Sequence, residues 1–272
     1  MSTSHENSQS MSLPRECCIS SEDVVARLAA ARAATNGHDV MLAFDADGTL
    51  WSGDVGNDLF HALIEAQAVR KAAYPALVRE AEEFAIAPSG NAVEIAKKLF
   101  DACEAGQYPE DRCFAMMAWV FAGFPLHDAI AFSRDVVKKI NLESRLHRFL
   151  DPIFEYTRNA NIPVWVVSAS PKWMVEISVA MFGIPSEHVI GMMPVIHDGF
   201  VTPELDGVPI YGPNKPMMLR EKCPQGILLG AFGDSSYDVP LLVMAKVPVA
   251  VRPKPSLLAR ARDVPNLVAV GL

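Results

Sequence analysis

The chain has 272 residues, of which 50% are hydrophobic and 21% are charged, so a sizeable core is available and global disorder is excluded. Its length fits one large domain, or one domain that carries an inserted partner. A net charge of -8 argues against nucleic acid as the main partner. An anionic small molecule remains compatible with this charge, because a metal ion or a local field can override it.

We expect no secretory signal in the first residues. Residues 1–19 predict a disordered tail, without the basic start and apolar stretch of a secretory signal. No apolar run in the chain reaches the length of a membrane span, so we expect no membrane partner. Five cysteines, an odd number without a CxxC pair, favour reduced thiols and a cytoplasmic location.

The first helix and the first strand have clear signals. A helix is predicted from the capping hydroxyl of Ser20 through the Ala-rich stretch to residue 34, and Asn36-Gly37 ends it. Residues 40–44, Val-Met-Leu-Ala-Phe, then form a short apolar run without alternation. Such a run is typical of a strand that is buried on both faces of a parallel sheet.

A long helical block follows, with no convincing strand in it. Its predicted helices begin near residue 60 and then cover 74–84, 91–105, 113–121 and 126–139. The block is far too long for one crossover between parallel strands. We therefore predict an inserted all-helical cap domain over residues 54–146, within a core domain made of 20–53 and 147–272.

The remaining chain alternates helices with strands. Alternation of this kind predicts an α/β fold with a doubly wound parallel sheet. Residues 198–202 and 207–211 resemble two arms of a small hairpin. The predicted strands are 163–167, 188–195, 227–232, 248–251 and 267–270, and the predicted helices are 144–159, 172–182, 214–222, 237–245 and 255–262.

Polar residues follow three of the predicted strands, where ligands bind in open α/β sheets. They form the segments Asp45-Ala46-Asp47-Gly48-Thr49, Ser168-Ala169-Ser170 and Gly233-Asp234-Ser235-Ser236-Tyr237-Asp238, and Lys215 opens a predicted helix between the last two. Four carboxylates crowded at one edge repel one another unless a cation offsets their charge. Mg²⁺ is commonly held by one or two carboxylates plus a substrate phosphate. The set predicts a Mg²⁺ site that faces a phosphoryl group.

These motifs resemble the haloacid dehalogenase (HAD) superfamily and, within it, the phosphoserine-phosphatase-like group. DxDGT directly after an apolar strand and GDSxxD after a later strand are highly specific, and the Ser and Lys motifs gain weight from their order. The resemblance implies a HAD-like Rossmannoid core and identifies the helical insertion as a C1 cap, which closes over the site and contacts the leaving group.

The resemblance also implies a role for each motif residue. Asp45 would be the nucleophile that forms an aspartyl-phosphate, and Asp47 would act as general acid and then as general base. The phosphate would be bound by Thr49, Ser168 and Lys215. The metal would be bound by Asp45, Asp234 and the backbone carbonyl of Asp47, with Gly233, Ser235 and Asp238 supporting these groups.

The sequence does not decide which residues bind the part of the substrate beyond its phosphate. Phosphoserine phosphatases place a Glu nine positions after the nucleophile to bind the substrate amine, and here that position is Asp54. Arg112 and Arg134 are candidates for binding a substrate carboxylate. Without such an Arg, an aminoalcohol or choline-type phosphate would fit better. Trp51 and Trp119 could then join an aromatic cage, although packing in the core is favoured for both.

The expected function is a Mg²⁺-dependent phosphomonoester hydrolase that acts on a small phosphorylated metabolite. A sugar phosphomutase would use the same DxD motif, and a catalytically silent binding protein could share the fold. Dehalogenation needs no second Asp, so Asp47 argues against it. The sequence leaves the oligomeric state open.

Overall fold

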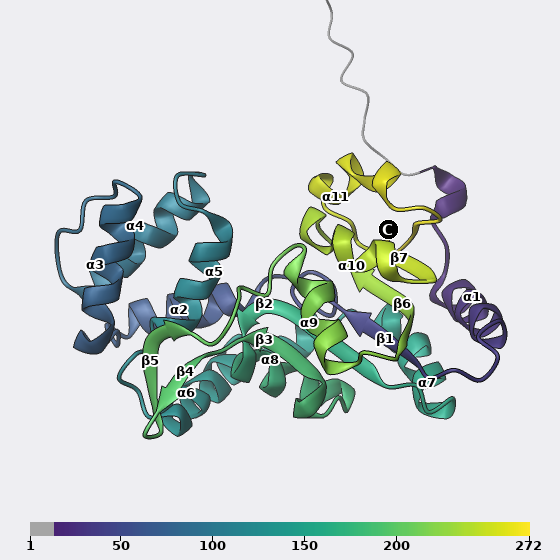
Figure 1. The fold of residues 1–272 in the computed structure, drawn as a ribbon, viewed down its shortest axis with the longest axis horizontal. Coiled ribbons are helices and arrows are strands. Elements are labelled where there is room, and N and C mark those ends of the chain that lie inside the picture. Colours follow the sequence, from purple (N-terminus) through teal and green to yellow (C-terminus); the bar gives the residue numbers. More distant parts are fainter. Residues whose placement is uncertain (1–13) are drawn as a thin grey trace, which may run out of the picture.

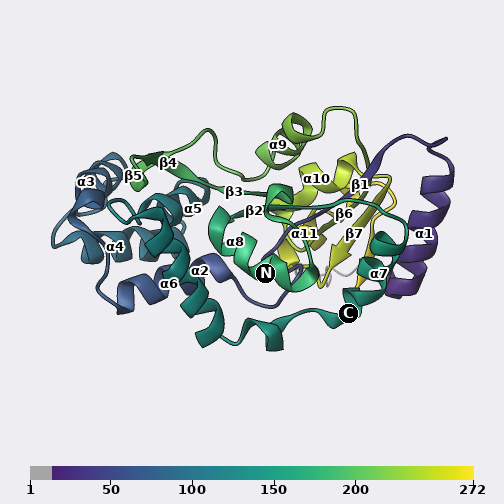
Figure 2. The same ribbon diagram turned by 90° about the horizontal axis from the view of Figure 1, so that it is seen from below.

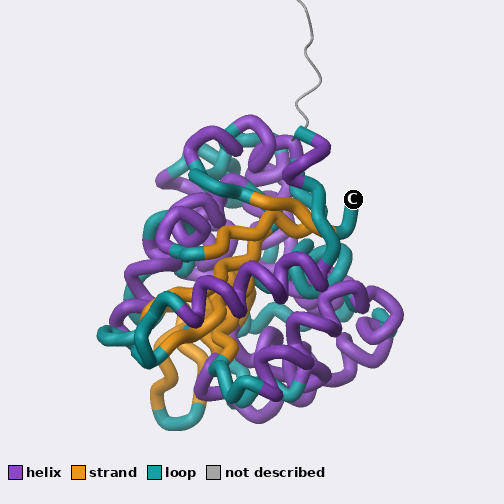
Figure 3. The backbone as a smooth tube through the Cα atoms, turned by 90° about the vertical axis from the view of Figure 1, so that its right-hand side faces the viewer, coloured by secondary structure: helices purple, strands orange, loops and turns teal. Residues whose placement is uncertain are grey.

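The computed structural model describes residues 14–272 and contains a six-stranded parallel sheet with helices on both faces (Figure 1 and Figure 3). The strand order is β3-β2-β1-β6-β7-β8. The strands are β1 (Val40–Phe44), β2 (Val164–Pro171), β3 (Val189–Met192), β6 (Ile227–Gly233), β7 (Val247–Val251) and β8 (Val268–Val270). The predicted doubly wound α/β architecture is confirmed.

Strand β1 lies inside the sheet, and its side chains alternate between two hydrophobic cores. Leu42 and Phe44 belong to the first core, and Met41 and Ala43 to the second. Phe44 also stacks on Phe232 of β6, with ring centroids 4.0 Å apart, which ties the two central strands together. The first core is covered by α1 (Ser21–Ala33), α7 (Asp151–Asn159) and α8 (Lys172–Val179), and the second by α9 (Asn214–Lys222), α10 (Val239–Met244) and α11 (Pro255–Ala259).

The chain between β1 and β2 forms a helical insertion, as predicted, which lies beside the sheet (Figure 1 and Figure 2). Its helices are α2 (Val55–Glu65), α3 (Tyr74–Glu83), α4 (Ala92–Glu104), α5 (Glu110–Trp119) and α6 (Leu126–Lys139). Asp54 precedes the first helix, and its side chain accepts a hydrogen bond from the Asn57 backbone and caps α2. The exact domain boundaries stay a prediction.

An antiparallel hairpin of β4 (Pro194–His197) and β5 (Phe200–Leu205) reaches from the core onto the insertion. The Val201 backbone donates to the Phe124 carbonyl and accepts from the Gly123 amide, both at 2.8 Å. The predicted arms at 198–202 and 207–211 are wrong, because Asp198 and Gly199 form the turn. Both residues have positive φ values, 50° and 80°, as a tight type I′ hairpin turn requires.

The described part of the predicted tail is ordered. A short 3₁₀ helix, Arg15–Cys17, precedes a bridge between Cys18 and Ala269, and the Ile19 amide donates to the Ala269 carbonyl at 2.9 Å. Cys18 and Ile19 thus pair with the edge strand β8, and residues 1–13 of the predicted tail lie outside the described residues. None of the helices within residues 14–272 is long and apolar enough to cross a bilayer.

Two short segments connect the insertion to the core and pair with each other. Trp51 and Leu146 form an antiparallel bridge, and the His147 amide donates to the Leu50 carbonyl at 2.9 Å. The helix predicted over 144–159 therefore begins only at Asp151, because Leu146 is extended and His147 is non-helical in this pairing. The pairing fixes the distance between the two connections to the insertion.

His147, in this junction, gives a prediction about pH and stability. Its Nδ1 lies 2.9 Å from the Thr49 carbonyl and must donate to it, so the neutral ring has a bare Nε2, which no described residue contacts with a hydrogen bond. Burial lowers the pKa of His147, against the opposing effect of the Thr49 hydrogen bond. The unfolded chain therefore binds a proton at His147 before the folded chain does, and stability falls as the pH drops through about 6.5.

Replacing His147 with Asn keeps a donor near the Thr49 carbonyl and removes the titration. We expect H147N to lose less unfolding free energy than the wild type between about pH 7.5 and pH 5.5, because one protonation of the unfolded state is gone. Urea denaturation at both pH values measures this difference. Equal losses in the two proteins would contradict the assignment.

Candidate active site

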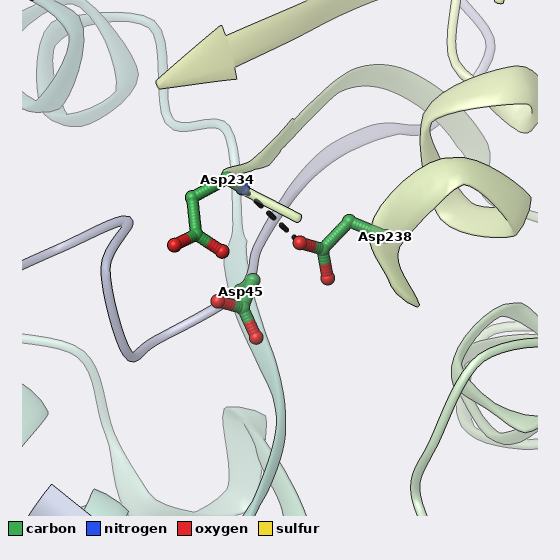
Figure 4. Close-up of side chains that lie close together, drawn as sticks. All are labelled: Asp45, Asp234 and Asp238. Carbon is green, nitrogen blue, oxygen red and sulfur yellow. Dashed lines mark hydrogen bonds between the residues drawn. The ribbon is translucent and has the colours of Figure 1, made fainter. Parts of the chain in front are cut away.

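Three buried carboxylates meet at the carboxyl ends of β1 and β6 (Figure 4). Asp45 follows β1, and Asp234 and Asp238 follow β6, as the strand-end argument predicts. Each side chain offers one oxygen, and these oxygens lie within 4.8 Å of one another. Like charges this close repel strongly in a buried site, so the cluster needs cations to remain ionised.

Lys215, in the first turn of α9, supplies one of these cations. Its Nζ donates to Asp45 Oδ1 and to Asp238 Oδ1, both at 2.6 Å. Burial opposes the ammonium form, but the two carboxylates outweigh it and raise the pKa of Lys215. Burial and the Asp238 charge raise the pKa of Asp45, and Lys215 offsets only part of that effect. One ammonium is thus too little for three carboxylates.

Lys254 is a second cation, which the sequence argument missed. Its Nζ lies 2.9 Å from Asp234 Oδ2, and its backbone amide donates to the Asp234 carbonyl at 2.7 Å. Burial nevertheless raises the pKa of Asp234 to about 6. Lys254 lies three residues beyond β7, at the same edge of the sheet, so applying the strand-end argument to that strand would have found it.

Both carboxylate oxygens of Asp238 accept hydrogen bonds from neighbouring residues. Its Oδ2 accepts hydrogen bonds from the Asp234 amide at 3.1 Å, the Ser235 amide at 3.0 Å and the Ser235 hydroxyl at 3.1 Å. A Cβ atom at Gly233 would overlap the Asp238 side chain, so this position needs glycine. With its other oxygen on Lys215, Asp238 orients the loop and the lysine, and Asp45 and Asp234 remain as carboxylates for a metal.

Asp47 is oriented by three donors. Its Oδ1 accepts from the Trp51 indole at 2.9 Å and the Val55 amide at 2.7 Å, and its Oδ2 from the Ser170 hydroxyl at 2.7 Å. Trp51 was expected to pack in the core, and the sequence assigned no role to Ser170, so the contacts of both with Asp47 are new. A Cβ atom at Gly56 would lie only 2.6 Å from the Ser170 hydroxyl, so glycine there leaves room for this contact.

The two predicted phosphate-binding hydroxyls differ in position. Ser168 borders the cleft, and its Oγ accepts from the Ser170 amide at 3.0 Å, which leaves its proton available for a ligand. Thr49 is fully buried behind Asp45, and its hydroxyl donates to Asp45 Oδ2 at 3.2 Å. Thr49 does not border the cleft, and its hydroxyl orients the Asp45 carboxylate, so phosphate binding by Thr49 stays a prediction.

The cleft in front of these groups has a volume of about 80 Å³ and lies between the insertion and the core. The insertion contributes Asp54 and Phe114, and Tyr211 comes from the loop after β5. Burial and the nearby Asp47 raise the pKa of Asp54 to about 8. The core contributes Tyr237, Lys254 and the polar residues described above.

The arginines that we considered for a substrate carboxylate lie elsewhere. Arg112 is paired with Glu80 at 2.5 Å and with Glu83 at 3.1 Å. Arg134 is exposed on α6. Neither borders the cleft, and Trp119 is buried in the insertion.

Comparison with known proteins identifies the family. The sequence pattern of the haloacid dehalogenase-like hydrolases matches residues 42–243, most of the chain. The chain belongs to the haloacid dehalogenase-like hydrolase family. The predicted resemblance is thereby confirmed. A search of the curated proteins gave no match.

Solved structures share the fold of this HAD hydrolase. A protein of unknown function from Bordetella pertussis Tohama I superposes with a TM-score of 0.66 at 19% identity, over 86% of this chain and 99% of that one. A HAD family hydrolase from Salmonella enterica serovar Typhi gives 0.53 at 14% identity, over 86% and 68%. A substrate-bound phosphoserine phosphatase gives 0.50 at 14% identity, over 85% and 92%. The helical insertion fits a C1 cap.

Proposed function

We propose that this HAD hydrolase is a Mg²⁺-dependent phosphomonoesterase that acts on a small phosphorylated metabolite through an aspartyl-phosphate. The proposal rests on two carboxylates that border the same cleft. Asp45 accepts a hydrogen bond from the Lys215 ammonium, and Asp47 accepts one from the Ser170 hydroxyl. Phosphoserine and aminoalcohol phosphates both belong to this class. Five free thiols support a reducing, cytoplasmic setting.

Asp45 and Asp47 have different roles in the proposed reaction. An oxygen of ionised Asp45 attacks phosphorus, and Asp47 gives its proton to the leaving alcohol oxygen. Asp47 then takes a proton from the water that cleaves the phosphorus–oxygen bond to Asp45, which regenerates both carboxyl groups. Since the Ser170 hydroxyl can accept as well as donate, it can keep its contact with Asp47 in both protonation states.

The residues at the cleft fit a magnesium ion. Asp45 and Asp234 offer carboxylate oxygens, and the Asp47 carbonyl accepts no hydrogen bond from the part of the chain that the structure describes. Oxygen ligands are those that Mg²⁺ prefers. A side chain at Gly48 would fill this space, because its Cβ would overlap Asp234 Oδ2. When bound, Mg²⁺ would neutralise charge on the phosphoryl oxygens and on the carboxylates.

Replacing Asp47 with Asn tests the proton-transfer role. The amide can keep an acceptor for Trp51 and Val55 but carries no transferable proton, so we expect kcat for an alkyl phosphate to fall about 10²- to 10⁴-fold. The unfolding temperature should stay near that of the wild type. A D47N enzyme with kcat within about tenfold of the wild type would contradict the role.

Release of phosphate from p-nitrophenyl phosphate tests the function itself. We expect turnover with Mg²⁺ and none after chelation, because Lys215 and Lys254 alone leave the carboxylates and the phosphate undercompensated. Restoring Mg²⁺ to the chelated protein should restore turnover. Hydrolysis that persists in the chelator would refute the metal-dependent mechanism.

A further inference from the structure

We propose that Lys254 couples the binding of Mg²⁺ to the binding of the substrate phosphate. Its ammonium neutralises Asp234 in the structure, and this charge opposes a divalent cation at the same carboxylate. When Asp234 binds Mg²⁺ instead, the Lys254 ammonium becomes available to a phosphoryl oxygen in the cleft, which Lys254 borders. The inference rests on the proposed phosphatase function and adds one residue to that site.

The backbone of Lys254 is held independently of its side chain. Its amide donates to the Asp234 carbonyl at 2.7 Å. Its carbonyl accepts from the Leu257 and Leu258 amides at 3.0 and 3.1 Å, where α11 begins. The loop therefore keeps its place beside Asp234 without the ammonium, and the side chain is free to change its partner.

The chain between β7 and Lys254 crosses from one neighbouring strand to the other. The Arg252 amide still pairs with β8, since it donates to the Val270 carbonyl at 3.0 Å, whereas Lys254 contacts the loop after β6 on the other side of β7. The φ of Arg252 is 42°, in the left-handed region that residues other than glycine rarely adopt. Backbone strain of this kind is concentrated at functional sites, and here it accompanies the crossing that brings Lys254 to Asp234.

The two lysines that border the cleft differ in how firmly they are held. Lys215 is buried and bonded to two carboxylates, Asp45 and Asp238, both at 2.6 Å. The Lys254 side chain is 57% exposed, and its one carboxylate partner within residues 14–272 is the buried Asp234. An ion pair with so exposed a partner is weak, so a phosphate dianion can compete for the Lys254 ammonium.

This exchange of partners makes the two ligands cooperative. Without phosphate, Mg²⁺ at Asp234 leaves the Lys254 ammonium beside a divalent cation, which weakens metal binding. With phosphate in the cleft, the same ammonium gains an anionic partner, so each ligand strengthens the binding of the other. Lys254 thus favours metal that is bound together with the substrate over metal that is bound alone.

Calorimetric titration of Mg²⁺ into the chelator-treated protein tests this inference, with and without saturating inorganic phosphate. K254M removes the charge and keeps the backbone contacts, so we expect it to bind Mg²⁺ alone about tenfold more tightly than the wild type does. The gain in Mg²⁺ affinity that phosphate produces should be at least about fivefold smaller in K254M. K254R, which keeps the charge, should match the wild type in both measurements.

The direction of the change separates a charge effect from a structural one. If Lys254 only oriented Asp234, its loss would weaken Mg²⁺ binding, and that result would overturn the inference. The matched control is K97M, which removes a lysine that is 59% exposed and paired with Asp101, and it should leave Mg²⁺ binding unchanged. K254Q provides the same test if K254M does not fold.

The outcomes also distinguish this inference from the function beneath it. If the wild type neither binds Mg²⁺ nor hydrolyses p-nitrophenyl phosphate, the phosphatase proposal fails and the inference fails with it. If the wild type does both, but K254M binds Mg²⁺ no more tightly or gains as much from phosphate, the phosphatase stands and the inference fails. A K254R protein that behaves like K254M would also overturn the inference, because the effect would then come from shape and not from charge.

Discussion

Asp45→Asn should reduce phosphatase turnover by at least about 10⁴-fold, because an amide is no nucleophile towards phosphorus and the two-step route is lost. The same substitution should not destabilise the fold. Burial and the Asp238 charge already disfavour ionised Asp45, and Lys215 keeps Asp238 as a partner in the variant. In the proposed mechanism, the carboxylate at position 45 would serve chemistry at the expense of stability.

Steady-state rates with p-nitrophenyl phosphate and thermal unfolding of the same samples measure both effects. We expect D45N to be inactive and at least as stable as the wild type, whereas the control D135N, which removes an exposed carboxylate from the insertion, should match the wild type in both measurements. A D45N protein that retains more than about a thousandth of the wild-type rate would contradict the assignment of the nucleophile.

Asp238→Ala should cause the largest loss of stability among these variants. It strips Lys215 of one partner, and it leaves the Asp234 amide and both Ser235 donors without their acceptor. Breaking a fully buried ion pair of this kind costs about 3–5 kcal/mol. D238N, which keeps a side-chain acceptor, should lose less.

Urea denaturation at neutral pH measures this loss. The control is D101A, which removes an exposed ion pair with Lys97 and should change the unfolding free energy by less than about 1 kcal/mol. If D238A also stayed within about 1 kcal/mol of the wild type, the buried network would not hold the loop as inferred.

Much of the core could be predicted because its signals are local. The apolar run of β1 needs no partner to be recognised, and the predicted cap of α1 at Ser20 is present, since the Ser20 side chain accepts from the Asp23 amide. The catalytic edge followed from one topological rule, since parallel strands end at the same side of a sheet. That rule placed Asp45 and Asp234 together without any knowledge of strand order.

The rest depends on contacts between distant segments, which no local pattern encodes. Ser170 reaches Asp47 only after β1 and β2 have paired. The wall of the cleft combines Phe114 from the insertion with Tyr211 from beyond the hairpin. Their proximity requires the hairpin to pack on the insertion.

The most direct test of the account is chemical trapping of the phosphorylated enzyme. During turnover of p-nitrophenyl phosphate, borohydride reduces an aspartyl-phosphate to homoserine, and peptide mass spectrometry locates the modified residue. The account predicts homoserine at position 45, dependent on both substrate and Mg²⁺. Active enzyme that yields no homoserine, or yields it at another carboxylate such as Asp234, would contradict the central claim that Asp45 is the group that receives the phosphoryl group.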